Sequence, residues 1–201
     1  MVCGDGAVGK TSIIKRYSEN TFNENYIATV GCNFATKKIK INGIEVTCQI
    51  WDIGGQPQFK VVRQSFYRGA KGAVFVFDVS RRETFENLEK WREEVNEIIT
   101  NIPCIVIGNK IDLPRKVSEE EAKEYSSKIN AKYFETSVTR NINIQQSLDD
   151  INQIVFEKQI ERKTVSQQTL SHAHELAKPK VQYPATLINN SLHQTLFSHK
   201  V

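Results

Sequence analysis

A glycine-rich segment close to the N-terminus has the residue types that bind phosphate. Residues 4–11 match Gly-x-x-x-x-Gly-Lys-Thr, a pattern that forms a phosphate-binding loop, or P-loop, between a strand and a helix. Its glycines let successive backbone N–H groups turn toward phosphate oxygens, and the following helix adds the positive end of its dipole. We expect Lys10 to reach the β- and γ-phosphates as a catalytic charge, and the Thr11 hydroxyl to bind Mg²⁺. The expected nucleotide contacts here are Asp5, Gly6, Ala7, Val8, Gly9, Lys10, Thr11 and Ser12.

A second polar segment has the residues needed to recognise the base of a nucleotide. Asn109, Lys110 and Asp112 follow the apolar run 103–108. A carboxylate at position 112 can accept hydrogen bonds from guanine N1–H and the 2-amino group, whereas adenine offers neither donor. Asn109 is suited to holding the loop and the base edge, and the Lys110 stem to covering the ring. The same residue types also favour an ordinary surface turn, but their position downstream of a P-loop favours guanine binding.

Four further positions are suited to binding Mg²⁺ or sensing the γ-phosphate. Asp52 follows an apolar run and begins Asp-Ile-Gly-Gly, so its carboxylate is expected near Mg²⁺, in contact through water. The Gly55 N–H can contact the γ-phosphate, and the Gln56 amide can orient the attacking water as a catalytic group. Thr29 is a candidate second Mg²⁺ ligand, although taken alone it is better interpreted as an ordinary loop threonine.

Strand-like and helix-like segments alternate over the first 160 residues and can bring these groups together. Continuous apolar runs at 73–78 and 103–108 predict buried parallel strands. Asn42-Gly43 predicts a tight hairpin between segments 35–42 and 44–51. Further strands are predicted at 1–3 and 132–136, and helices at 11–18, 84–100, 118–129 and 144–160. This alternation predicts an α/β P-loop NTPase fold, with a mostly parallel six-stranded sheet, helices on both faces and a truncated first strand.

The composition changes after residue 160. Residues 161–201 are rich in Ser, Gln, Thr, His and Asn and contain Pro179 and Pro184. We therefore expect a nucleotide-binding domain over residues 1–160 and a flexible polar tail over residues 161–201. All four histidines lie in this tail, and a solvated tail is favoured over metal binding by them.

The charge distribution and the cysteine content indicate which partners the chain can bind and in which compartment it is found. Of the net charge of +4, the tail carries +3, so the domain lacks the basic face of a nucleic-acid binder. The four cysteines form no Cys-x-x-Cys pair and fit buried thiols in a reducing cytosol. No run of about 18 apolar residues or signal peptide is present. No cysteine follows Cys104, so prenylation and stable membrane attachment are not expected, and we expect a cytoplasmic protein with transient membrane contact.

The chain resembles the Ras superfamily of small GTPases, specifically its Rab branch, over residues 1 to about 160. Besides the motifs above, the resemblance rests on Thr21-Phe22-Asn23-Glu24, Tyr26-Ile27-Ala28-Thr29-Val30-Gly31 with Phe34, Trp51-Asp52, Phe66-Tyr67-Arg68-Gly69-Ala70, Phe77-Asp78-Val79, Thr84-Phe85 and Glu135-Thr136-Ser137. It implies a monomer whose two switch segments, Thr29 to Val30 and Gly55 to Phe59, respond to the nucleotide. Effectors, exchange factors and GTPase-activating proteins are expected to bind residues 26–34 and 55–68.

The same resemblance adds nucleotide contacts that spacing alone does not suggest. It implies that Phe22 packs against the guanine ring and that Tyr26 is a further nucleotide contact. It also implies that Ser137 and Val138 belong to a loop that donates backbone N–H groups to guanine O6, with Thr139 beside them.

Four features depart from the family pattern. Only three residues precede the P-loop where the family has a full strand, so we expect the native chain to extend further upstream. Pro57 follows Gln56 where the family has an acidic residue, and it restricts the glutamine backbone. Gly54 replaces an alanine, a change that we expect to be neutral. Val138-Thr139 replaces Ala-Lys, so a lysine that helps to cover the base is missing.

These observations predict a molecular switch that binds GTP with Mg²⁺ and hydrolyses it slowly to GDP and phosphate. The resemblance implies a role like that of Rab regulators of vesicle traffic. No arginine is expected to act in cis, since Arg63 and Arg68 fall in the second switch region, so a partner should supply one. The alternative is a nucleotide-regulated binding module with little or no hydrolysis. An ATPase is a further alternative, which Asp112 disfavours.

Overall fold

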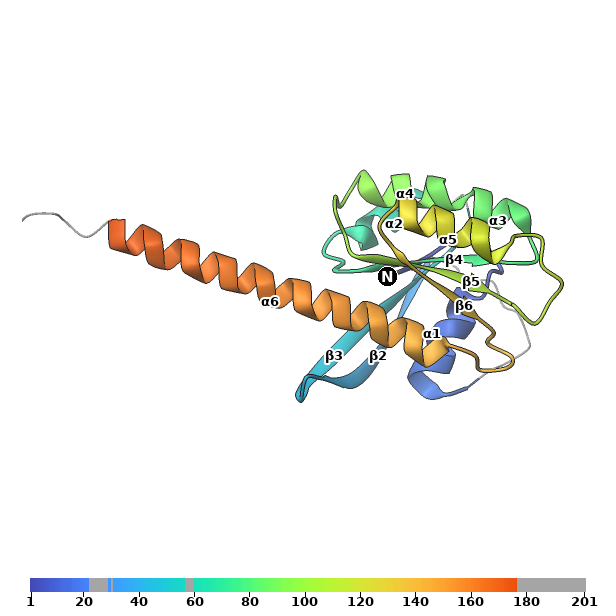
Figure 1. Cartoon of the computed structure of the whole chain (residues 1–201), viewed down its shortest axis with the longest axis horizontal. Helices are drawn as coiled ribbons and strands as arrows, with labels where there is room; N and C mark the ends of the chain where they lie inside the picture. The colour runs from blue at the N-terminus through green and yellow to red at the C-terminus, as the bar shows by residue number, and fades with distance from the viewer. Residues whose placement is uncertain (22–28, 30, 57–59, 177–201) are drawn as a thin grey trace, which may run out of the picture. The chain divides into compact units, whose positions relative to one another are not determined.

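A six-stranded sheet forms the centre of the structure (Figure 1). The computed structural model describes residues 1–21, 29, 31–56 and 60–176. The strand order is β2-β3-β1-β4-β5-β6, with β2 antiparallel to β3 and every other neighbouring pair parallel. The strands are β1 (Val2–Cys3), β2 (Cys32–Ile41), β3 (Ile44–Ile53), β4 (Ala73–Asp78), β5 (Cys104–Asn109) and β6 (Lys132–Thr136). The predicted fold class is therefore confirmed.

The antiparallel hairpin of β2 and β3 turns at the predicted dipeptide. Asn42 and Gly43 both have positive φ angles, 50° and 81°, as a two-residue turn that matches the twist of the strands requires. Ile41 pairs with Ile44 across the turn. The two strands continue beyond the predicted ranges toward the P-loop, because Cys32 and Ile53 still pair with each other.

Helices cover both faces of the sheet (Figure 1). They are α1 (Lys10–Glu19), α2 (Lys60–Tyr67), α3 (Arg82–Glu86), α4 (Leu88–Asn96), α5 (Glu119–Lys128) and α6 (Ile144–Leu176). Successive side chains of β4 point to opposite faces. Val74 and Val76 pack in the core cluster with residues of α1 and the first turns of α6. Phe75 and Phe77 pack in the cluster with residues of α2, α4 and α5.

Two helix predictions need correction. The single helix expected over 84–100 is two helices, α3 and α4, joined at Asn87. The backbone N–H of Asn87 divides its hydrogen bond between the carbonyl oxygens of Glu83 and Phe85, and its side chain bonds to the P-loop. The helix expected to end near residue 160 continues to Leu176, because residues 161–176 contain no glycine or proline to stop it.

The chain divides by its internal contacts into two units, Met1–Ile160 and Glu161–Val201. The boundary between these units coincides with the predicted one between the domain and a flexible polar tail. Within that tail Glu161–Leu176 are helical, and residues 177–201 lie outside the described part of the chain. Among the described residues, no helix combines the length and apolar character needed to cross a bilayer.

The carboxyl ends of the strands bring the candidate residues to one edge of the sheet. The P-loop follows β1, and Asp52 lies near the end of β3. Asp78 and Asn109 are the last residues of β4 and β5, where they pair with each other across the ladder. Ligands in open α/β sheets bind at this edge, so the fold places the predicted site where the architecture favours one.

Candidate functional site

The P-loop needs glycine at two of its positions for steric reasons. Gly4 has a φ of 141°, and a Cβ on it would lie 2.1 Å from the carbonyl oxygen of Val76. Gly9 has a φ of 101°, and a Cβ there would lie 2.3 Å from the side-chain nitrogen of Asn109. The loop is therefore packed tightly against β4 and against the segment predicted to bind the base.

The lysine of the P-loop lies inside the loop. Lys10 Nζ donates hydrogen bonds of 2.7 Å to the carbonyl oxygens of Gly4 and Asp5, and the residue is 6% exposed. Burial lowers the pKa of Lys10 to about 8, although Asp52 opposes the shift. The Lys10 ammonium group is held close to the backbone amides of the loop, so a bound phosphate group would contact the ammonium and the amides together.

Other P-loop side chains have structural contacts. The Asp5 carboxylate accepts hydrogen bonds from Asn87 Nδ2 at 2.8 Å and Trp91 Nε1 at 2.7 Å, so it points toward α4. The Val8 side chain is fully buried in the core. Ser12 is half-buried on α1. For Asp5 and Val8, only the backbone is left to meet a nucleotide.

Three oxygen-bearing side chains from separate segments converge beside the loop. Thr11 Oγ1 donates to Asp52 Oδ2 at 2.5 Å and lies 2.8 Å from Thr29 Oγ1, which is 3.4 Å from the same carboxylate oxygen. Asp52 is 4% exposed, and its other oxygen, Oδ1, is buried with no hydrogen-bond partner among the described residues. Mg²⁺ prefers such oxygen donors, so these residues fit the predicted ion.

The second switch begins in direct contact with the P-loop. A Cβ on Gly55 would lie 2.6 Å from the carbonyl oxygen of Gly4 and 2.6 Å from the Gly6 nitrogen. The Gly54 N–H donates to Gly31 O at 2.9 Å, and a Cβ on Gly54 would lie 2.6 Å from that oxygen. Glycine is therefore accommodated at position 54, whereas this backbone leaves no space for the methyl group of an alanine.

The segment that follows β5 is tied to the P-loop. Asn109 is buried, and its Nδ2 donates to Val8 O at 2.9 Å while its Oδ1 accepts from Thr136 Oγ1 at 2.9 Å. Lys110 Nζ donates to Ala7 O at 2.8 Å. The base-recognition and phosphate-binding segments therefore form one connected surface.

The residues predicted to contact guanine also lie together. Ser137 Oγ donates to Asp112 Oδ1 at 2.5 Å and lies 2.8 Å from Thr139 Oγ1. Burial raises the pKa of Asp112, but hydrogen bonds led by that of Ser137 outweigh it and hold the pKa below the ordinary value. The carboxylate is thus kept ionised as an acceptor. Val138 is buried in the core, so its contribution to the site is its backbone.

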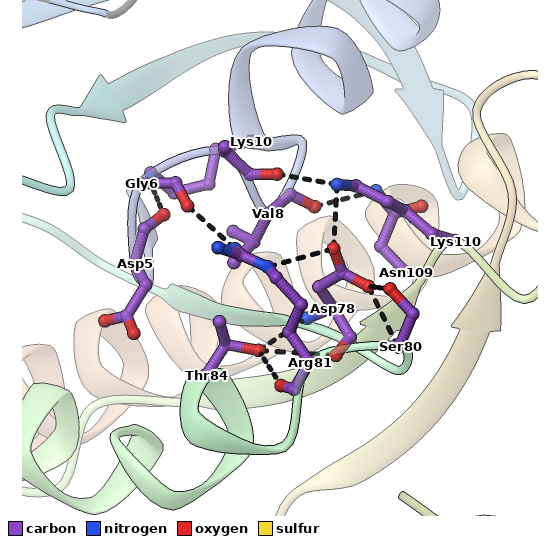
Figure 2. Close-up of polar contacts among 11 residues, drawn as sticks. Asp5, Gly6, Val8, Lys10, Asp78, Ser80, Arg81, Thr84, Asn109 and Lys110 are labelled. Atoms are coloured by element: carbon purple, nitrogen blue, oxygen red, sulfur yellow. Dashed lines mark hydrogen bonds and ion pairs between the residues drawn. The ribbon is translucent and has the colours of Figure 1, made fainter. Parts of the chain in front are cut away.

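Two residues at this edge received no role from sequence reasoning. Asp78 is buried and pairs with Lys110 at 2.7 Å and with Arg81 at 3.3 Å. Arg81 Nη2 also donates to Gly6 O at 2.8 Å, so an arginine of this chain does reach the P-loop (Figure 2). Asp78 ends an apolar strand as Asn109 does, which is a signal that could have found it. Arg81 belongs to no pattern.

Hydrogen bonds keep Asp78 ionised between these two cations. Burial raises its pKa, but hydrogen bonds from Lys110 and Ser80 lower it below the ordinary value. Ser80 donates to the same carboxylate through both its N–H and its hydroxyl, at 2.9 and 2.6 Å.

Some predicted positions fall outside the part of the chain that the structure describes. Phe22 and Tyr26 lie outside the described residues, as do Val30 of the first switch segment and Pro57. Within the second partner segment, Gly55, Gln56 and residues 60–68 are described.

Known proteins resemble this chain over most of its first 160 residues. The model of the Ras family matches residues 1–157. The mouse protein Ras-related protein Rab-21 is 38% identical over 154 residues, which cover 75% of this chain and 69% of the mouse protein. Ras-related protein Rab11B from Nicotiana tabacum is 37% identical over 168 residues, covering 80% of this chain and 77% of the tobacco protein.

Proposed function

The chain belongs to the Ras family and is a small GTPase of the Rab-like branch, and on this premise we propose how its residues bind and hydrolyse GTP. The observation that carries the proposal is the convergence of Thr11, Thr29 and Asp52. These side chains come from α1, the first switch and β3. A switch requires side chains from separate segments to contact one bound nucleotide, because the state of the nucleotide can then control the position of a loop.

Two parts of this connected surface bind the nucleotide. Asp112 accepts hydrogen bonds from the guanine base, with Asn109, Lys110 and the segment Ser137–Thr139 around it. The P-loop amides and Lys10 bind the phosphates. Thr11 and Thr29 would hold Mg²⁺ directly and Asp52 through water, and the ion, when bound, neutralises charge on the phosphate oxygens.

Switching follows from contacts that depend on the γ-phosphate. Thr29 and the Gly55 N–H are held while the γ-phosphate is present, and both segments are released when it leaves. Gly54 and Gly31 are joined by a hydrogen bond, so the two segments would change together.

Hydrolysis is slow in this proposal because the chain mainly supplies positioning and charge. Gln56 orients the attacking water, and Lys10 stabilises negative charge on the phosphates. We expect an intrinsic rate on the order of 10⁻⁴ s⁻¹, as in Ras, and a large acceleration by a partner that supplies an arginine.

Partners would bind the two segments that sense the nucleotide, residues 26–34 and 55–68. The exposed Phe34 packs against Trp51, with ring centroids 5.3 Å apart, and Trp51 against Phe66 at 5.5 Å. This aromatic surface connects both segments. By resemblance to the Rab relatives we propose a monomeric, cytoplasmic regulator of vesicle traffic that contacts membranes transiently.

Single-turnover hydrolysis of GTP tests the enzymatic part. We expect slow release of phosphate by the parent protein and a still slower release by Gln56→Leu. Equal rates for the two proteins would contradict a catalytic role for Gln56 and favour the alternative, a binding module with little hydrolysis, which Pro57 motivates. Tight binding of GDP by both proteins is the control that the nucleotide site is intact.

A further inference from the structure

We propose that Arg63 is a positioning residue for GTP hydrolysis, because it holds the main chain of Gln56 from inside the protein. This inference rests on the proposed function of Gln56. Arg63 Nη1 donates a hydrogen bond of 2.7 Å to the carbonyl oxygen of Gln56. Arg63 lies on α2 and is only 4% exposed, so water cannot easily take its place.

A buried carboxylate on α4 fixes the direction of the guanidinium. Arg63 Nε donates to Glu94 Oε1 at 3.0 Å, and Nη2 donates to Glu94 Oε2 at 2.9 Å. Tyr67 donates to the same carboxylate at 2.8 Å. A forked pair of this kind restricts both groups to one geometry. The remaining nitrogen, Nη1, is therefore aimed at Gln56.

The same arginine is connected to the P-loop. Its guanidinium lies over the ring of Trp91, 4.5 Å from the centroid. Trp91 Nε1 in turn donates to the Asp5 carboxylate at 2.7 Å. Gln56, through Arg63, and the phosphate-binding loop, through Asp5, are thus both connected to Trp91 on α4. This shared contact can keep their relative position within the narrow limits that catalysis requires.

The sequence around Gln56 makes this hydrogen bond more important. Residue 57 is proline, which has no backbone N–H. In the peptide group that joins Gln56 to Pro57, the Gln56 carbonyl is therefore the only hydrogen-bonding group. Arg63 holds that carbonyl, and so fixes the backbone from which the Gln56 amide extends.

A purely structural role for Arg63, in which it only fastens α2 to α4, predicts a different result. Such a role would affect stability and nucleotide retention whether or not Gln56 is present. A positioning role affects the chemical step, and only while the glutamine amide is there to be positioned.

The test combines substitutions at Arg63 and Gln56. Arg63→Lys keeps the charge beside Glu94 but cannot make the fork and reach the Gln56 carbonyl together. The double variant Arg63→Met/Glu94→Gln removes both charges and leaves Tyr67 an acceptor, in case the lysine variant does not fold. Arg92→Lys is the matched control, since Arg92 makes an arginine–carboxylate pair with Glu89 within α4, away from Gln56.

We expect single-turnover GTP hydrolysis by either Arg63 variant to slow by about 10-fold, with GDP and GTP dissociation rates within about twofold of the parent. In the Gln56→Leu background the same substitutions should cause no further loss. The inference is wrong if the Arg63 variants hydrolyse GTP at the parental rate, or if their loss is undiminished in that background. If Gln56→Leu alone leaves the rate unchanged, the proposed function fails first, and this inference with it.

Discussion

Arg81 Nη2 donates a hydrogen bond of 2.8 Å to the carbonyl oxygen of Gly6, within the P-loop (Figure 2). Lys110 makes the equivalent bond to the next carbonyl, that of Ala7, also at 2.8 Å. Both cations share the buried carboxylate of Asp78. Carbonyl groups that are held on the outside of a loop leave its N–H groups free to point inward. The two hydrogen bonds therefore favour the conformation that binds phosphate.

Removing Arg81 should accordingly weaken nucleotide retention. We expect Arg81→Ala to speed GDP dissociation by about 5- to 10-fold, which corresponds to the loss of one net hydrogen bond of about 1 kcal/mol. Stopped-flow release of a fluorescent GDP analogue measures the rate. Arg82→Ala is the control, because Arg82 pairs with the surface carboxylates of Glu86 and Glu121. Equal dissociation rates for both variants would show that Arg81 does not support the loop.

The central strands could be predicted because a short, continuous apolar run and an Asn-Gly dipeptide are each typical of one local structure. The apolar run 73–78 is β4, with every residue buried, and Asn42-Gly43 forms the predicted turn. The end of α6 could not be predicted from periodicity. Periodic apolar residues report a buried face, whereas Glu161–Leu176 is helical through backbone hydrogen bonds and suitable residue types, which leave no such pattern.

The candidate site was predictable where its chemistry is local. Thr11 and Asp52 were identified from motifs, and the structure brings their side chains together. Arg63 was not expected to act in cis and Arg81 was given no role, because each donates to a main-chain carbonyl and such a contact leaves no residue pattern in the sequence. The steric demand for glycine at position 54 was not predicted, because its neighbour, the Gly31 carbonyl, comes from another segment. Sequence spacing contains no information about such approaches between distant segments.

Adding a methyl group at Gly54 should separate the two switch segments. A Cβ there would lie 2.6 Å from Gly31 O and 3.0 Å from Thr29 O, so we expect Gly54→Ala to lower the free energy of unfolding by about 1–3 kcal/mol. Urea denaturation of the nucleotide-free protein measures this. Gly6→Ala is the matched control, because a Cβ on Gly6 has no heavy atom within 4 Å, and it should change stability by less than about 0.5 kcal/mol. Similar losses for both variants would contradict the steric explanation.

The Asp112 carboxylate should determine which base is bound. Asp112→Asn replaces one acceptor oxygen by a donor, so guanine loses a charge-assisted partner while xanthine, which has a second carbonyl, gains one. We expect the ratio of GDP to XDP affinity to fall by about 100-fold or more, since hydrogen bonds to charged groups contribute about 1.5–3 kcal/mol each. Competition binding with both nucleotides measures the ratio. An unchanged ratio would mean that Asp112 does not contact the base.

Nucleotide binding should take up protons in the pH range where Lys10 titrates. Burial lowers the pKa of Lys10 to about 8, so the free protein loses this proton as the pH rises through 8. Phosphate groups favour the charged amine and raise the pKa again, so the bound lysine stays protonated. At pH 8.5 we expect an uptake of about 0.8 protons per GDP bound, compared with about 0.2 at pH 7.5.

Titration calorimetry of GDP binding in two buffers with different ionisation enthalpies measures this proton uptake directly. The nucleotide phosphates are fully ionised at pH 8.5, so they contribute little to the difference between the buffers. The comparison at pH 7.5 serves as the internal control, because Lys10 is then mostly protonated before binding. If the uptake does not increase between the two pH values, the Lys10 ammonium is not the group that meets the phosphates.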